Sequence, residues 1–323
     1  MPFDSLKARI DAAPSPSRKL QLGVAVAVVA TQALIAVTGA VVRVTGSGLG
    51  CPTWPQCLPG SMVPEYHREY ATLNQWIEYG NRLFTGIVGL IAVAAFVLAL
   101  LSKPRDRRYL RLAFAMPVGV AIQAGIGGIT VRTGLLWWTV AIHLLVSTVI
   151  VWLATLLVHA VPRDDARPGA AGTLAGRWLY PQTALLAGVL VTGTMVTGAG
   201  PHGGDPDTPR LDAPIETLAH VHASFLYTFL GSLVVLGLLL RRVANPPWRR
   251  YLVLVAVVLA QGTIGLVQYW NGVPELLVCL HVLGAMSAVI ATASLWCGIR
   301  GYGRQPDAHK VQPTAVAQVP QTT

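Results

Sequence analysis

Eight apolar runs of about 20 residues recur along this chain, and no other feature constrains its fold as strongly. A helix needs about 20 predominantly apolar residues to cross the roughly 30 Å hydrocarbon core of a bilayer. Hydrophobic residues make up 53% of the 323 residues and charged residues only 12%, a balance that a water-soluble domain does not have. We therefore predict an all-α integral membrane protein of eight transmembrane helices, with the lipid bilayer as its solvent. The helices are expected at residues 21–42, 77–101, 110–131, 138–161, 178–199, 218–240, 251–270 and 276–298.

The formal charge of +10 is explained by where the basic residues lie relative to these runs. With the N-terminus inside, nineteen lysines and arginines fall on the inner side and five on the outer side. Basic residues gather on the cytoplasmic side of membrane proteins. We therefore expect both termini in the cytoplasm, and the charge does not indicate a nucleic-acid partner. The five outer basic residues are Arg43, Arg68, Arg82, Arg132 and Arg210.

Three segments lie outside the predicted helical halves. Residues 1–20 carry charge but no short apolar stretch with a small-residue cleavage site, so we expect a retained cytoplasmic segment rather than a signal peptide. Residues 162–177 are predicted to be a cytoplasmic linker. Residues 299–323, rich in Gln, Pro, Thr and Ala, are predicted to be a disordered cytoplasmic tail.

An internal repeat relates the two halves of the chain. The run QAGIG begins at Gln123 and the run QGTIG at Gln261, and a histidine follows each glutamine at a spacing of twenty, as His143 and His281. Each unit has an even number of helices, so the two copies share one orientation. The sequence therefore predicts two four-helix bundles, residues 21–161 and 178–298, related by a pseudo-twofold axis along the membrane normal.

Three helices carry histidines near their outer ends. His143 and His281 occupy matched positions, and His220 and His222 open the sixth helix, all roughly 5 to 10 Å below the outer interface. A buried imidazole is costly unless it is satisfied, and neutral imidazole suits iron better than zinc in the absence of further ligands. A hydrogen-bonded packing role is the alternative. Only one of His220 and His222 can face a given cofactor, because they are two residues apart.

Two cysteines stand in the first outer loop, where oxidation is permitted. Cys51 and Cys57 are consistent either with a redox-active pair or with a structural staple.

The run from Arg43 to Cys57, RVTGSGLGCPTWPQC, closely resembles the first outer loop of the haem A synthase family. The similarity extends over all eight helices. It includes WIEYGNR at residues 76–82, which is similar to the family's Glu-x-x-His-Arg, and GAGPHGGD at residues 198–205, which is similar to its third outer loop. Members of this family oxidise a methyl group of haem O to the formyl group of haem A, using a bound haem B and external electrons.

The resemblance implies roles for individual residues. His222 and His281 would hold haem B in the C-terminal half, with His220 as the reserve candidate in the sixth helix. His143 and Glu78 would serve the haem O site in the N-terminal half. The metal-binding set would therefore be His143, His222 and His281, and Cys51 and Cys57 would form the family's loop disulfide.

One position departs from the family pattern, because Asn81 stands where histidine is usual. An amide ligates iron far more weakly than imidazole does. We therefore expect the substrate haem to be held mainly by His143, with an open or weakly occupied sixth position. Lost activity is the alternative outcome of the same change.

Glu78, Asn81 and Arg82 share one helical face. Glu78 is interpreted either as a carboxylate beside the reacting methyl group or as half of an ion pair with Arg82. The outer arginines Arg43, Arg82 and Arg132 suit haem propionates, and the alternative is that they extend to the lipid headgroups.

The sequence thus predicts an oxidoreductase of the bacterial cytoplasmic membrane, with haem O and haem A as ligands. Haem O synthase and an electron donor are the protein partners that the resemblance implies, and a homo-oligomer stays open. Two rival hypotheses are a b-type electron carrier, which would not need Glu78, and a haem-delivery protein.

Overall fold

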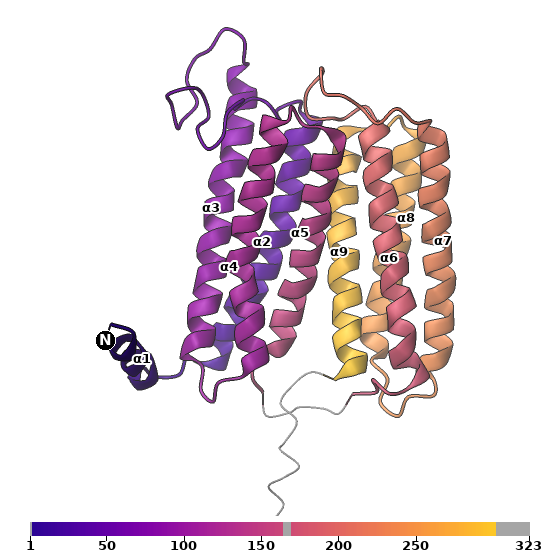
Figure 1. Ribbon diagram of the computed structural model, residues 1–323. Coiled ribbons are helices and arrows are strands. Elements are labelled where there is room, and N and C mark those ends of the chain that lie inside the picture. Colours follow the sequence, from indigo (N-terminus) through magenta and orange to yellow (C-terminus); the bar gives the residue numbers. More distant parts are fainter. Residues whose placement is uncertain (1, 164–168, 302–323) are drawn as a thin grey trace, which may run out of the picture.

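The computed structural model describes residues 2–163 and 169–301, and the regular elements in these ranges are helices (Figure 1). Eight of them are long and apolar enough to cross a membrane, which confirms the predicted eight-span integral membrane protein. Most begin a few residues before the predicted boundary, because polar residues continue the helix beyond the apolar run. These helices are α2 (Arg18–Val44), α3 (Thr72–Leu101), α4 (Arg107–Arg132), α5 (Trp137–Ala160), α6 (Leu174–Ala199), α7 (Ile215–Leu240), α8 (Trp248–Trp270) and α9 (Glu275–Arg300).

A further helix, α1 (Pro2–Ala12), precedes them and was not expected from the sequence. Arg105 forms an ion pair with Asp11 at 2.6 Å, and Lys103 Nζ donates to the carbonyl oxygens of Asp11 and Ala13. These contacts tie the end of α1 to the connection between α3 and α4. The predicted tail beyond residue 301 and residues 164–168 of the predicted linker lie outside the described residues.

The helices form two four-membered bundles, α2–α5 and α6–α9, side by side (Figure 1). α2 packs on α9, α5 packs on α6, and α5 packs on α9, which is the pairing that a twofold relation between the halves requires. The α4–α5 and α8–α9 turns are alike in detail. Each places a glycine and the following residue, Gly134 with Leu135 and Gly272 with Val273, in the left-handed region.

The helix faces differ in side-chain size rather than in polarity. On α3, Ala92, Ala95 and Ala99 are buried against the neighbouring helices, while Leu83 and Leu90 are exposed on the outside of the bundle. Small residues inside allow close helix packing, and large apolar residues outside suit lipid tails. The lipid-facing surface is therefore as apolar as the core.

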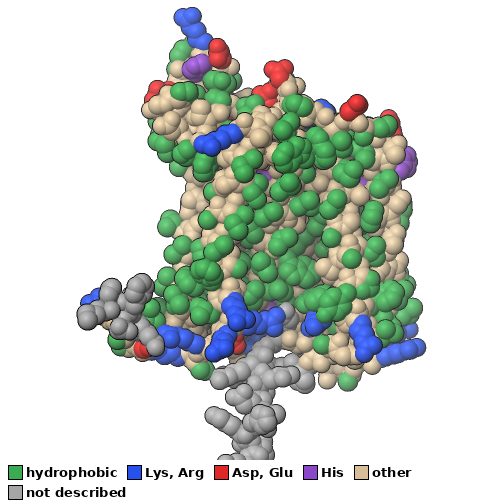
Figure 2. All heavy atoms as spheres, viewed as in Figure 1, with side chains coloured by type: hydrophobic (Ala, Val, Ile, Leu, Met, Phe, Trp, Pro, Cys, Tyr) green, Lys and Arg blue, Asp and Glu red, His purple; other side chains and the backbone are tan. Residues whose placement is uncertain are grey.

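The two ends of the bundle differ in chemistry. The disulfide end carries the loops at residues 45–71, 133–136, 200–214 and 271–274. At the opposite end, which we call the arginine-rich end, Lys and Arg side chains gather, as Figure 2 shows for one face. The candidate site lies at the disulfide end.

Helix packing in the second half makes a testable prediction. A side chain at Gly188 of α6 would collide with the ring of Phe225 on α7, whereas the space beside Gly231 of α7 is open. Gly188→Leu should therefore lower the free energy of unfolding by about 1–3 kcal/mol through overpacking. Gly231→Leu is the matched control and should leave the melting temperature in detergent nearly unchanged. Equal effects of the two variants would contradict this packing.

Candidate functional site

Three of the predicted histidines lie at one depth near the disulfide end. His143 and His281 are each the seventh residue of their helices, α5 and α9, and His222 is the eighth residue of α7. At 1.5 Å per residue these positions lie about 10 Å below the helix starts. The structure thus brings the three imidazoles into one layer of the bundle.

His222 and His281 face each other, with their ring centroids 6.5 Å apart. His222 Nδ1 donates to the carbonyl oxygen of Val189 at 3.0 Å and lies 3.2 Å from Thr192 Oγ1, so Nε2 is the nitrogen left for a metal. A metal with bonds of about 2 Å to one nitrogen of each ring needs centroids about 6 Å apart. The pair therefore fits haem iron held by two histidines.

Glycines of the adjacent helices make room for these rings. A Cβ atom at Gly193 would lie 3.1 Å from Cε1 of His222, and one at Gly265 would lie 3.0 Å from Cε1 of His281. Any larger residue would push the imidazole out of place. The group that approaches each of these two glycines most closely is thus an imidazole ring.

His220 is not part of this group. Its side chain is exposed, and its Nδ1 hydrogen-bonds with the carbonyl oxygen of Glu216 in its own helix at 2.7 Å. The two-residue separation places it on another face of α7 from His222. His222 is therefore the candidate in this helix that faces His281.

A cavity of about 380 Å³ lies chiefly among α2–α5 and is bordered by loops at the disulfide end. Its volume is within the range of small-molecule sites. Most of its lining is apolar. The polar side chains predicted from the sequence that line it are Arg43, Glu78, Asn81, Arg82 and His143.

Asn81 occupies the place in the first half that His222 occupies in the second. Thr38 Oγ1 donates to Asn81 Oδ1 at 2.7 Å, and the repeat-related Thr192 contacts His222. Asn81 is therefore the structural counterpart of His222.

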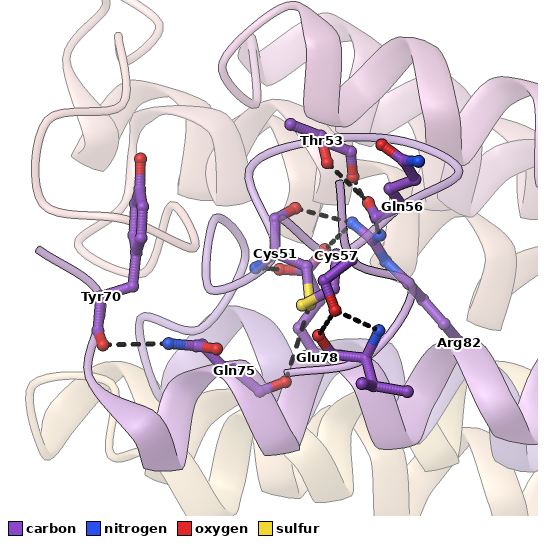
Figure 3. The surroundings of a disulfide bond; sticks show 10 residues. Cys51, Thr53, Gln56, Cys57, Tyr70, Gln75, Glu78 and Arg82 are labelled. Carbon is purple, nitrogen blue, oxygen red and sulfur yellow. Dashed lines mark hydrogen bonds and ion pairs between the residues drawn. A yellow bond between two sulfur atoms is a disulfide. The ribbon is translucent and has the colours of Figure 1, made fainter. Parts of the chain in front are cut away.

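The predicted Cys51–Cys57 disulfide is confirmed, and both residues are almost fully buried. The Cys51 backbone N–H donates to Glu78 Oε2 at 2.7 Å (Figure 3). Glu78 is only 5% exposed. Its carboxylate therefore supports the disulfide loop at the same time as it lines the cavity, and the burial of the sulfurs favours a bracing role for the disulfide.

Arg82 holds the same loop from α3. Its Nη1 donates to the carbonyl oxygens of Thr53 and Gln56, and its Nη2 donates to that of Cys51 and to Glu78 Oε1 at 2.6 Å (Figure 3). The ion pair between Glu78 and Arg82, one of the two interpretations of these residues, is present. Both terminal nitrogens of this guanidinium are thus occupied within the protein.

The other two predicted arginines differ from each other. Arg132 is exposed, donates to the carbonyl oxygen of Trp54 at 3.0 Å and lies over the Trp54 ring, so it is bound to the disulfide loop. Arg43 lines the cavity and forms no ion pair within the described residues. Of the three, Arg43 has the side chain most available to a ligand.

Two glutamines with no role assigned from the sequence fix the histidine helices. Gln123 Nε2 donates to the His143 carbonyl oxygen at 3.0 Å, and Gln261 Nε2 donates to that of His281 at 2.8 Å. The Nδ1 atoms of both histidines are buried without a hydrogen-bond partner. The repeated spacing of twenty residues pairs each glutamine with its histidine in the sequence. It did not indicate that the glutamine side chain bonds to the backbone carbonyl oxygen of that histidine.

The cavity also extends beneath a loop of the second half, which sequence reasoning did not connect with it. His202, Thr208 and Arg210, all from the α6–α7 loop, contribute to its lining. His202 Nε2 hydrogen-bonds with the carbonyl oxygen of Val273 at 2.8 Å, so this side chain also ties two loops together.

Comparison with known proteins adds an independent finding. A family model described as cytochrome oxidase assembly protein matches residues 23–202. A haem A synthase of Symbiobacterium thermophilum is 30% identical over 48% of this chain and 52% of that protein, so the match spans about half the length of this relative. Haem A synthases of Bartonella bacilliformis and Azorhizobium caulinodans are 23% and 28% identical over 83% and 82% of this chain, and over 88% and 90% of their own lengths.

The contacts by which Glu78 and Arg82 hold the disulfide loop to α3 allow a prediction about stability. Arg82→Leu leaves the buried Glu78 carboxylate without its partner, and breaking a buried ion pair costs about 3–5 kcal/mol. We expect a large fall in melting temperature and rapid proteolysis of the loop at residues 53–70.

The control is Arg105→Leu. Its ion pair with Asp11 has the same 2.6 Å length, but the two side chains are 39% and 48% exposed. A surface pair contributes about 1 kcal/mol or less. Similar losses in the two variants would show that burial does not decide the strength of the Glu78–Arg82 pair.

Proposed function

Because this chain belongs to the cytochrome oxidase assembly protein family, we propose that it is a haem A synthase, an oxidoreductase that converts the C8 methyl group of haem O into the formyl group of haem A. The observation that carries the proposal is that the two repeated halves present different groups at equivalent places. One half presents two facing imidazoles, and the other presents one imidazole, a carboxylate and a cavity.

In the C-terminal half, His222 and His281 would hold haem B. The ring separation of 6.5 Å supports this assignment. The hydrogen bond from His222 Nδ1 to the Val189 carbonyl oxygen also supports it, because it leaves Nε2 as the nitrogen that can bind a metal. Bound haem supplies the redox chemistry, while the protein supplies binding, orientation and exclusion of water.

In the N-terminal half, His143 would hold the substrate haem. Asn81 faces the same cavity and keeps the threonine contact of its histidine counterpart, yet its amide is a weak ligand for iron. This difference supports a substrate site with one strong protein ligand. A weakly held haem is also one that can be released as product.

Glu78 would act next to the reacting methyl group. The Cys51 N–H and the Arg82 guanidinium both donate to this carboxylate and hold it in place. A fixed negative charge at this wall of the cavity would stabilise positive charge that develops on the substrate during oxidation. The disulfide loop would thereby position a catalytic group.

The proposal includes location and partners. The disulfide end would face outward and the arginine-rich end the cytoplasm, in agreement with the nineteen-to-five distribution of basic residues and with an oxidised cysteine pair. Both termini would then be cytoplasmic in a bacterial cell membrane. Haem O synthase would supply the substrate, and a separate donor would supply electrons. Formation of a homo-oligomer stays a prediction.

Pigment analysis tests the proposed reaction. Protein purified from cells that make haem O should yield haem B together with haem A or a hydroxylated haem O on extraction. Glu78→Ala should abolish the oxidised pigments and preserve the haem B absorption spectrum, because Glu78 lies in the other half. Haem B alone from the unaltered protein would favour an electron carrier, and unchanged conversion in the variant would remove the catalytic role of Glu78.

The ligand assignment in α7 has its own test. His222→Ala should lose the low-spin absorption spectrum of haem held by two histidines, whereas His220→Ala should keep it, because only the first ring faces His281. Visible absorption of the reduced protein is the measurement. The reverse result would assign the ligand to His220.

A further inference from the structure

Two arginines from different halves of the chain meet at the disulfide end of the cavity. Arg43 comes from the last turn of α2, and Arg210 comes from the loop between α6 and α7. A Cβ atom at Gly204 would lie 3.9 Å from Cγ of Arg43, and one at the neighbouring Gly203 would collide with the guanidinium of Arg210, so both arginines border the same short loop segment. Within residues 2–163 and 169–301 neither forms an ion pair, whereas Arg82 in the same lining is paired with Glu78. Two neighbouring guanidinium groups without an acidic partner repel each other, and a bound anion would relieve this repulsion.

The loop that carries Arg210 is fixed in place over the cavity. Gly48 N–H donates to the Gly204 carbonyl oxygen at 2.8 Å, which joins the first-half loop to the second-half loop. Arg210 Nη2 donates to the Pro201 carbonyl oxygen at 2.7 Å, and its guanidinium lies against Gly203, where a side chain would collide with it. Arg210 is therefore held at the cavity with donors left over.

A buried hydroxyl in the same loop provides an independent observation. Thr208 lines the cavity, is only 7% exposed, and has a fully buried Oγ1 with no hydrogen-bond partner. An unsatisfied hydroxyl away from water is unfavourable unless something bonds to it. Thr208 therefore adds an unpartnered hydroxyl to the lining that contains both arginines.

We infer that Arg43, Arg210 and Thr208 form a carboxylate-binding site that holds the propionate groups of the tetrapyrrole in the N-terminal cavity. The inference rests on the proposed function and adds to it two residues from the opposite half of the chain. Guanidinium groups match carboxylates in a forked geometry. With carboxylates at the disulfide end and His143 deeper in the lining, the site selects an amphipathic substrate and sets its orientation.

The probes are haem O and its dimethyl ester, in which both propionate charges are removed. Full-length protein purified with its resident haem is titrated with each, and difference absorbance gives the two dissociation constants. The unaltered protein should prefer the free acid by about 100-fold, since each charged hydrogen-bonding contact contributes about tenfold or more. Arg210→Leu should reduce the preference about tenfold, and Arg43→Leu with Arg210→Leu should abolish it.

Controls separate this inference from the proposed function. Arg68→Leu removes an exposed arginine from the first-half loop and should leave the preference unchanged. The resident haem spectrum should be the same in every variant, which shows that the protein is folded. Equal binding of acid and ester by the unaltered protein, or an undiminished preference in the double variant, overturns the carboxylate site alone. Failure to bind haem O in either form overturns the proposed function as well.

Discussion

Hydrocarbon offers no hydrogen bonds, so polar groups inside this bundle must be satisfied by the protein or by a ligand. Gln123 and Gln261 bond to the backbone of the histidine helices, and the Glu78 carboxylate is shared between a loop N–H and Arg82. Groups left without partners are therefore informative. The Nδ1 atoms of two histidines and the hydroxyl of Thr208 are among them, and all belong to the candidate site or its surroundings.

Duplication explains the architecture, and a departure from it would explain the proposed chemistry. The two halves share their helix pairing, their glycine turns and their glutamine contacts. They differ where Thr38 meets Asn81 and Thr192 meets His222. One half can therefore offer two imidazoles, while the other offers a single imidazole and a cavity. In the proposed function, a permanently held cofactor and an exchangeable substrate would need this difference in binding strength.

The disulfide loop connects stability with the site. It is joined to α3 through Glu78 and Arg82, and it packs Trp54 against the glycine face of α4 at Gly128. The second-half loop is in turn joined to it through Gly48 and Gly204. Loops from both halves thus border the cavity together. The three arginines that looked equivalent in the sequence therefore differ in their contacts. Arg82 and Arg132 donate to carbonyl oxygens of the disulfide loop, whereas Arg43 lines the cavity.

The sequence by itself determined the eight spans, the internal repeat and the family. These depend on hydrophobic length, spacing and local motifs, which are properties of neighbouring residues along the chain. Only the tertiary structure decided that His222 rather than His220 faces His281, and that the cavity of the first half is completed by Arg210 from the second. Helix rotation and the docking of loops depend on contacts between residues far apart in the sequence. No single segment of the chain encodes those contacts, so they emerge only when the helices pack.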